Sequence, residues 1–483
     1  MTTIDTGKTL DLQRVLIKGG VLSPSEMIQI LDIAKALGHR SILFGSRQDI
    51  MLPPRHHGKM MPELKSLEDD LLSDRVYQNI MSSYVASDIF PSTSWLNGST
   101  FLYILEQFRY HPRLKINIVD PKQRLVPLFT GDLNFIASDQ EDYWYLYLRL
   151  NGYEDAMYPV LINSWDIASL SKTIEDIYVK LDHVDILFEE VNEILDSNNR
   201  TIDEELKLPF SPFPYYEGMN KMDGDQYWLG LYWRNNNYDL EFLKALCNLC
   251  LEVQVGKICI TPWKSIIVKG IPHSSKLIWE KLLGKFGINI RHSSLELNWH
   301  LPVGSKRALD LKNFLVNQFN ALDISTYGLT FGISGDNRKK WFNSIIIEEN
   351  LDSSQALGIS LRPSYHVHYS KSFDPNQLEY QCFAQDVDRS ALPSLLIELS
   401  RMYFDQLEDK KAVTPEPNRK EEVEPVIYNL FECRDCLSTY DSRYGDPSQH
   451  VQSGIPFEQL ADSYVCSVCG ASKKQFRLKQ VTP

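Results

Sequence analysis

The chain has 483 residues, of which 43% are hydrophobic and 23% are charged, as in an ordinary folded protein. This length predicts two or three domains, and the net charge of −13 argues against a nucleic-acid partner, because phosphate binding needs a basic face. No long apolar run and no signal-peptide pattern occur, so we expect a cytoplasmic protein without a membrane partner.

The first predicted elements are a helix and a strand. Ser23 is the expected N-cap, Pro24 occupies the first turn, and Glu26 stands three residues after the cap, which is typical of a helix start. Apolar residues at helical spacing continue until Gly38. Residues 41–52 are then expected to form one strand.

A similar helix and strand return much later in the chain. The second helix opens near Leu240, and the second strand is expected over residues 257–268. Arg47 and Trp263 occupy equivalent places in the two copies, and this pair sets the offset between them.

Two further segments repeat as well. The strand-like segment 115–119 corresponds to 329–333, and the segment 133–136 corresponds to 344–347. We therefore predict an α/β (α+β) body made of two related halves, an internal duplication of a large unit. The predicted halves are residues 1–200 and 201–407.

These halves resemble the sulfite and nitrite reductases that carry siroheme and a four-iron cluster. The strand of that family that ends in Thr-Arg-Gln or Thr-Pro-Trp-Gln is matched by Ser46-Arg47-Gln48 and Thr261-Pro262-Trp263-Lys264. The family's Asn-Ile-x-Ser-Ser phrase is matched by residues 79–83. The resemblance covers most of residues 10–400.

The resemblance implies that Arg47, Arg113 and Lys115 hold substrate oxygens or haem carboxylates, which makes them candidates for an anion or tetrapyrrole site. The alternative is that they are solvated surface residues. The cluster ligands of the family are missing, because the aligned segments 298–304 and 335–340 contain no cysteine. Siroheme and six-electron reduction are therefore not expected in this chain.

A linker is predicted at residues 408–425, which are charged, contain three prolines and lack an apolar period. Upstream of it, Cys247 and Cys250 form a Cys-x-x-Cys pair inside a helical apolar pattern. That pattern favours core thiols over a second metal site.

Two more Cys-x-x-Cys pairs, here called knuckles, follow the linker: Cys433 with Cys436, and Cys466 with Cys469. Four thiolates can surround one metal as a tetrahedron, which selects zinc or iron. Zinc ribbons usually separate their pairs by roughly 15 to 20 residues. The loop from Cys436 to Cys466 is longer than that, so its contents must decide between the metals.

The segment around the knuckles contains enough aromatic residues to form a small core, which a bound metal would stabilise. They are Phe431, Tyr440, Phe457, Tyr464 and Phe476. With Gly445-Asp446-Pro447 in the loop and Gly470 after the second knuckle, the segment resembles a rubredoxin. The predicted rubredoxin domain is residues 426–483.

The resemblance implies one iron bound by four ligands, with zinc as the alternative metal. The implied ligands are Cys433, Cys436, Cys466 and Cys469. Leu437 stands where rubredoxins usually have Gly, Ser467 where they usually have Pro, and Tyr464 where they usually have Trp. The first of these departures is expected to strain its knuckle and shift the redox potential.

These observations predict an electron-transfer protein in which an iron-carrying rubredoxin domain is tethered to a non-catalytic reductase-like body. Separate redox proteins would be its donor and acceptor. One alternative is an enzyme whose body binds siroheme or another tetrapyrrole and reduces an oxyanion, with the rubredoxin as built-in donor. Another alternative makes the body a module that docks a separate reductase.

Overall fold

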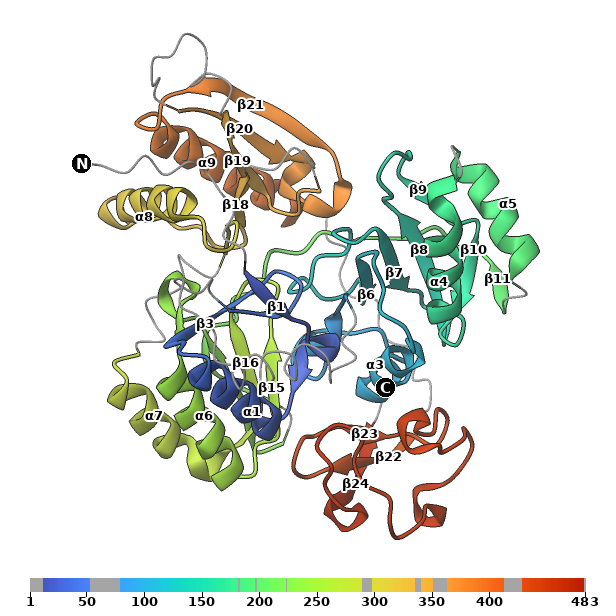
Figure 1. Cartoon of the computed structure of the whole chain (residues 1–483). Helices are drawn as coiled ribbons and strands as arrows, with labels where there is room; N and C mark the ends of the chain where they lie inside the picture. Colours follow the sequence, from blue (N-terminus) through green and yellow to red (C-terminus); the bar gives the residue numbers. More distant parts are fainter. Residues whose placement is uncertain are drawn as a thin grey trace. The chain divides into compact units, whose positions relative to one another are not determined.

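The fold is taken from a computed structural model of the whole chain (Figure 1). The structure describes residues 12–52, 79–180, 183–195, 198–222, 224–288, 298–334, 340–350, 363–411 and 428–481. These residues form two compact units. The larger unit is drawn from residues 12–208, 216–291 and 425–483, and the smaller from residues 209–215 and 292–424.

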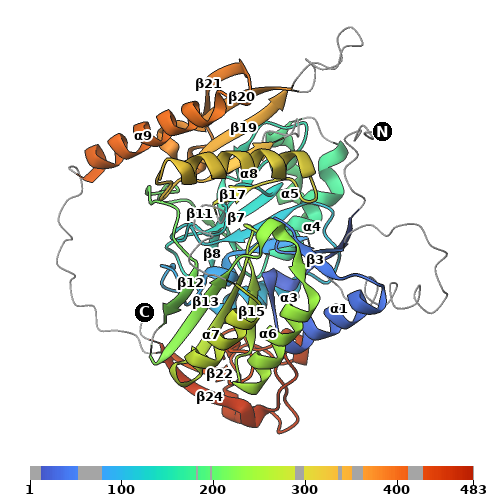
Figure 2. The same ribbon diagram turned by 90° about the vertical axis from the view of Figure 1, so that its left-hand side faces the viewer.

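Helix α1 (Pro24–Ala36) of the larger unit begins as predicted. Glu26 N donates a hydrogen bond of 3.2 Å to the Ser23 hydroxyl, and Ser23 N donates one of 2.8 Å to the Glu26 carboxylate. This reciprocal capping box satisfies two backbone donors at the helix start. Helix α1 packs against α6 (Leu240–Glu252) in one hydrophobic core (Figure 2).

Two sheets of the larger unit share one plan. The first has the order β1 (Gln13–Val15), β4 (Ile50–Leu52), β3 (Ser41–Phe44) and β14 (Tyr238–Asp239). The second has the order β12 (Gly218–Lys221), β13 (Gln226–Leu231), β16 (Ile266–Pro272), β15 (Lys257–Ile260) and β2 (Val21–Leu22). Helix α7 (Lys276–Lys285) follows β16.

The two sheets repeat each other with the offset that Arg47 and Trp263 predicted. Val15 pairs with Ile50 in the first sheet, and Leu231 pairs with Ile266 in the second. The helix N-caps Ser23 and Asp239 are related by the same offset. The predicted duplication is thus visible in the strand register and in the capping residues.

Each half gives one short strand to the sheet of the other. Tyr238 of β14 pairs with Ile42, and Leu22 of β2 pairs with Ile258. Because of this exchange, each sheet needs residues from both halves, and both sheets lie in one compact unit. The boundary between residues 200 and 201 therefore stays a prediction about the repeat, because the spatial units divide the chain elsewhere.

The two strands predicted over residues 41–52 and 257–268 are each a hairpin, which corrects the sequence interpretation. In the first, Gly45 N donates to the Asp49 carbonyl at 2.8 Å, and β3 and β4 run antiparallel. The chain reverses through left-handed residues, Gln48 with φ 60° and Lys264 with φ 61°. Since neither is glycine, the residue types did not reveal these reversals.

A third sheet in the larger unit has seven strands. Its main order is β11 (Asn199–Thr201), β10 (Val160–Asn163), β8 (Tyr143–Leu148), β7 (Leu133–Ala137), β6 (Ile116–Val119) and β5 (Ile80–Ser82), and β9 (Ala156–Met157) pairs with β8. Strands β5, β6 and β7 are parallel to one another, and β8 is antiparallel to β7. The helices of this region are α3 (Gly98–Gln107), α4 (Ile167–Ile177) and α5 (Val184–Ile194).

The sheet of the smaller unit follows the same pattern. Its order is β17 (Trp299–His300), β18 (Phe331–Ser334), β19 (Ile345–Asn350), β20 (Ser364–Ser370) and β21 (Tyr380–Val387). The first three strands are parallel and the next is antiparallel, so β18 and β19 correspond to β6 and β7 as the repeat predicted. The helices of this unit are α8 (Lys306–Ala321) and α9 (Leu392–Lys411).

Helix α9 also corrects the start of the predicted linker, because its last turn includes residues 408–411. Glu408, Lys410 and Lys411 of this turn are good helix formers. They extend a helix whose buried residues Leu396, Leu399 and Tyr403 anchor it in the core. Residues 412–425 of the predicted linker lie outside the described residues. None of the helices that the structure describes has the length and apolarity needed to cross a bilayer.

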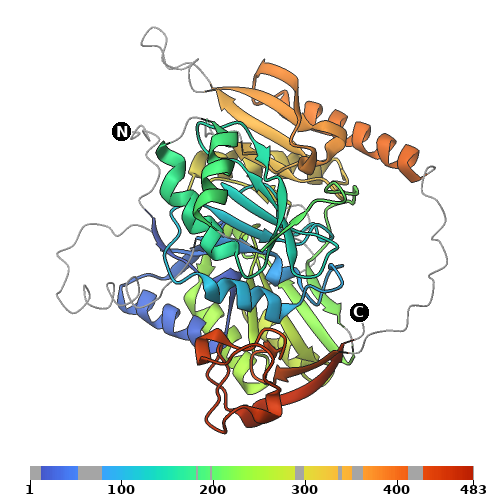
Figure 3. The ribbon, with the colours of Figure 1, turned by 90° about the vertical axis from the view of Figure 1, so that its right-hand side faces the viewer.

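The C-terminal residues fold around a three-stranded sheet with the order β23 (Thr439–Tyr440), β22 (Tyr428–Cys433) and β24 (Phe476–Val481). Tyr440, Phe457 and Tyr464 are buried, and Phe431 and Phe476 pack against them, so the five predicted aromatic residues do form one cluster. Figures 1 and 3 show this module, in red, beside α3 of the larger unit.

Candidate metal centre

The two knuckles have the same backbone geometry. In the first, Leu437 N donates to the Cys433 carbonyl at 2.9 Å. In the second, Gly470 N donates to the Cys466 carbonyl at 2.8 Å. Strand β22 ends at Cys433 and positions the first knuckle, and the turn that follows Tyr464 positions the second.

The residue after each knuckle has a left-handed backbone, with φ 58° at Leu437 and φ 72° at Gly470. Glycine adopts this region freely, whereas for a residue with a Cβ atom it costs roughly 1–2 kcal/mol. The expected strain at Leu437 is therefore present in its backbone. Its effect on a redox potential stays a prediction.

The four cysteine sulfurs converge on one point. All four lie within 4.8 Å of one another, with 3.7 Å between the Sγ atoms of Cys433 and Cys469 and 3.3 Å between those of Cys436 and Cys466. A tetrahedral metal with bonds of about 2.3 Å to sulfur requires sulfur separations of about 3.8 Å. The donor set and its spacing therefore fit a single tetrahedral metal ion.

The environment of the sulfurs also favours a bound cation. Cys433, Cys436 and Cys466 are buried, and Cys469 is half-buried. Burial raises the pKa of the Cys436 thiol well above its ordinary value, because the buried thiolate would be poorly solvated and lies close to the other cysteines. A metal cation would offset this penalty and hold the thiolates together.

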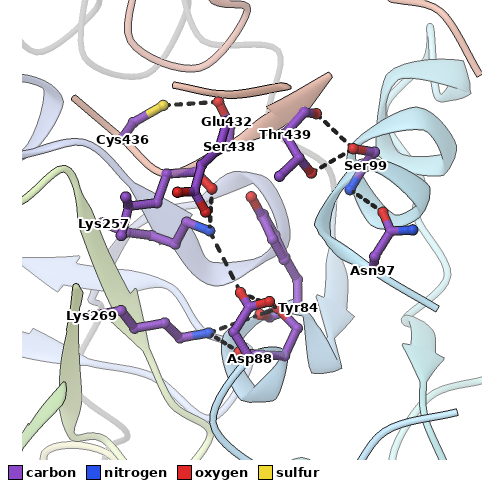
Figure 4. Close-up of polar contacts among 12 residues, drawn as sticks. Tyr84, Asp88, Asn97, Ser99, Lys257, Lys269, Glu432, Cys436, Ser438 and Thr439 are labelled. Atoms are coloured by element: carbon purple, nitrogen blue, oxygen red, sulfur yellow. Dashed lines mark hydrogen bonds and ion pairs between the residues drawn. The ribbon is translucent and has the colours of Figure 1, made fainter. Parts of the chain in front are cut away.

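Ser438 is a member of this site that the sequence did not reveal. Its hydroxyl oxygen lies 2.9 Å from Cys436 Sγ (Figure 4). The same oxygen lies 3.0 Å from Cys466 Sγ. A serine near a cysteine pair is common, and only the turn of the first knuckle brings this hydroxyl against sulfurs from both knuckles. Towards thiolates the hydroxyl is the donor.

Arg47, the first residue of the predicted anion site, is engaged inside the protein. Its guanidinium donates to Asn117 Oδ1 and to the backbone carbonyls of Asn79 and Ile116. Desolvation, and after it the charge of Arg14, lowers the pKa of Arg47 to about 9, so it stays positively charged at neutral pH. It ties the first hairpin turn to the starts of β5 and β6.

The other two predicted anion-site residues, Arg113 and Lys115, lie just before β6. The Arg113 side chain is 74% exposed and forms an ion pair of 3.0 Å with the buried carboxylate of Glu175. Lys115 donates its backbone N–H to Asp132 at 2.8 Å. The three residues are thus placed individually, and their role toward an anion stays a prediction.

The smaller unit contains the segments where the resembling reductases have cluster cysteines. Asn298 is buried there, and its side-chain amide donates to Thr326 and to the Leu329 carbonyl. Residues 335–339 lie outside the described residues. Across the described part of the chain, the one group of clustered metal-binding side chains is the set of four C-terminal cysteines.

Comparison with known proteins identifies the C-terminal domain. A family model for rubredoxin matches residues 430–476. Rubredoxin-2 of Chlorobaculum tepidum is 41% identical over 46 residues, which are 10% of this chain and 88% of that protein. The chain belongs to the rubredoxin family through this domain.

Further rubredoxins are similar over the same domain. Probable Rubredoxin-1 of Methanocaldococcus jannaschii is 43% identical over 42 residues, which are 9% of this chain. The chain spans about half of that relative, 52% of its length. These matches establish the family of the C-terminal domain, and they do not include the body that precedes it.

The body was compared through its structure. The solved structure of the Mycobacterium tuberculosis NirA protein superposes with a TM-score of 0.61 at 16% identity, covering 84% of this chain and 82% of that one. At this identity the likeness shows the fold alone. It confirms the predicted α/β (α+β) fold of the duplicated body, which is similar to the fold of the NirA protein.

Proposed function

We propose that this protein is an electron carrier whose rubredoxin domain binds one iron ion. Cys433, Cys436, Cys466 and Cys469 are the proposed ligands. The observation that carries the proposal is the convergence of their four sulfurs within 4.8 Å in a domain of the rubredoxin family. When bound, iron supplies a ferric–ferrous couple that four thiolates can hold in both states.

The protein residues around the sulfurs have separate roles in this proposal. The four thiolates hold the ion, and the Ser438 hydroxyl donates to sulfur. The aromatic cluster of Tyr440, Phe457 and Tyr464 fills the interior of the domain and keeps water away from it. Cys469 is the half-buried ligand, so the second knuckle is the side from which a separate redox protein can approach.

Metal analysis and a visible absorption spectrum of the purified full-length protein test this function. We expect one iron per chain and the absorption bands of ferric thiolate, which dithionite bleaches and air restores. One zinc ion and no iron, from cells supplied with iron, would contradict the proposal. Zinc remains the alternative occupant of the same four ligands.

A second candidate function is an oxyanion reductase whose body binds a tetrapyrrole. Two observations favour it: the fold likeness of the body to the NirA protein, and Arg47 Nε, which is buried without a hydrogen-bond partner among the described residues. Titrating the protein with siroheme tests this candidate. A shift of the siroheme bands away from those of free siroheme, weakened in Arg47→Ala, would support it, and a spectrum equal to the sum of protein and free siroheme would contradict it.

A further inference from the structure

The first knuckle of the rubredoxin domain packs closely against β15, β16 and the residue before β15. A Cβ atom on Gly256 would lie 1.2 Å from the Asp435 carbonyl oxygen and 2.1 Å from Cys436 Cα. A Cβ atom on Gly270 would lie 2.2 Å from Leu437 Cδ1. Two glycines of the body therefore make room for the backbone and the side chain of this knuckle.

Lys257 lies at the centre of this contact (Figure 4). Its side chain is 3% exposed, and its ammonium group donates to the Leu437 carbonyl oxygen at 3.0 Å. The same nitrogen lies 5.1 Å from the ring centre of Tyr84 and 4.0 Å from the Asp88 carboxylate. The body thus places a buried ammonium group beside the residue that follows Cys436.

A second buried lysine lies on the neighbouring strand. Lys269 donates to the carbonyl oxygens of Tyr84 and Ser87, at 3.4 Å and 2.5 Å. Together with the carboxylate of Asp88, these two lysines form one polar group beside the first knuckle (Figure 4). Burial opposes ionisation of Asp88, but Lys257, Lys269 and Lys479 outweigh it and lower its pKa to about 2.

Of the two lysines, Lys257 holds its proton more strongly. Burial disfavours its ammonium form, but Tyr84 and then Asp88 outweigh that effect and raise its pKa. Burial lowers the pKa of Lys269. At neutral pH Lys257 therefore keeps its positive charge beside the first knuckle.

We propose that Lys257 is a positioning residue of the metal centre. Through Lys257, docking of the rubredoxin domain on the body favours reduction of the centre, and reduction of the centre favours docking. This inference rests on the proposed iron function. Lys257 acts in two ways. First, its hydrogen bond fixes the Leu437 carbonyl and therefore the peptide bond that joins Leu437 to Ser438. Second, it keeps a positive charge near the four thiolates.

The physical reason is a difference in charge between the two redox states. Four thiolates with a ferric ion carry a formal charge of minus one, and one electron from an external reductant makes it minus two, with no bond formed or broken. A buried positive charge stabilises the more negative state more strongly, because the surroundings are poorly polarisable. Since coupling is reciprocal, the reduced domain also docks more tightly.

The size of the effect can be measured as a redox potential. If the reduced domain docks about tenfold more tightly, the potential of the docked domain is about 59 mV above that of the undocked one. The experiment uses the full-length, iron-loaded protein and titrates its ferric-thiolate absorption with redox mediators. We expect Lys257→Met to lower the midpoint potential by about this amount.

Lys281→Met is the matched control, because it removes the same charge from an exposed site on α7 of the same unit. Its potential is expected to equal that of the wild type. An unchanged potential in Lys257→Met, or an equal shift in Lys281→Met, would overturn the proposal.

Gly256→Ala separates the docked contact from any general effect of the substitution. Its Cβ atom collides with the backbone of the first knuckle, so we expect the domain to undock and the potential to fall. Adding Lys257→Met to Gly256→Ala should then change the potential no further, and an equal second drop would contradict the proposal. Failure of the proposed function would look different, because a protein without iron has no ferric-thiolate band to titrate.

Discussion

Leu437 of the rubredoxin domain inserts its side chain where Gly270 of the body has none. The point where Gly270 would carry a Cβ atom is 2.2 Å from Leu437 Cδ1. Leu437 also has a left-handed backbone with φ 58°, in the same region as its counterpart Gly470 with φ 72°. The strain at this position therefore coincides with a side-chain contact that a glycine could not make.

Leu437→Gly should change stability in opposite directions in the docked and undocked protein. The left-handed backbone costs a leucine roughly 1–2 kcal/mol. Burying its side chain contributes roughly 1.5–3 kcal/mol. In the wild-type background we expect net destabilisation of about 1 kcal/mol, because the contact is lost.

In the Gly256→Ala background the same substitution should stabilise the domain by about 1 kcal/mol, because only the strain is relieved. Urea unfolding of the rubredoxin domain, followed at the ferric-thiolate bands, measures both cases. The same sign in the two backgrounds would show that the leucine has no docking role.

Cys466→Ser should abolish iron binding and bleach the protein. The Sγ atom of Cys466 lies 3.3 Å from that of Cys436, and the described residues offer no fifth sulfur in the group. Metal analysis after purification gives the result directly. Cys382→Ser is the control, since Cys382 is exposed and outside the group, and it should keep its full iron content.

Ser438→Ala should leave iron bound but lower its reduction potential. The hydroxyl is 2.9 Å and 3.0 Å from two sulfurs, and a donor to sulfur stabilises the more negative, reduced state. One hydrogen bond of roughly 0.5–1.5 kcal/mol corresponds to roughly 20–60 mV for one electron. Redox titration of Ser467→Ala, on the second knuckle, gives the comparison, and equal potentials for both variants would refute the role of Ser438.

The protein should not reduce sulfite or nitrite, even with siroheme and a strong chemical donor. That reaction needs a cluster coupled to the haem, and Asn298, Gly304, Asp336 and Lys340 stand where its cysteines are expected. A steady-state assay of the full-length protein decides the question. Turnover that disappears in Arg47→Ala would show that the body is an enzyme.

Local patterns in the sequence were enough for several features. The capping residues Ser23 and Glu26 predicted the start of α1, because a capping box depends on residues three positions apart. The spacing of Cys433, Cys436 and their counterparts predicted the group of sulfurs, because each knuckle is a short turn with its own geometry. The equivalence of Arg47 and Trp263 predicted the repeat that the strand registers follow.

Tertiary structure decided the features that depend on distant residues. The exchange of β2 and β14 between the two sheets has no local signal, since pairing partners such as Leu22 and Ile258 are brought together only by the folded core. Lys257 contacts Leu437 from a distant part of the sequence. From the sequence alone, a lysine in an apolar strand indicates nothing more than a strand position. Its charge acts strongly on a neighbour only when packing buries it, because water then no longer screens the charge.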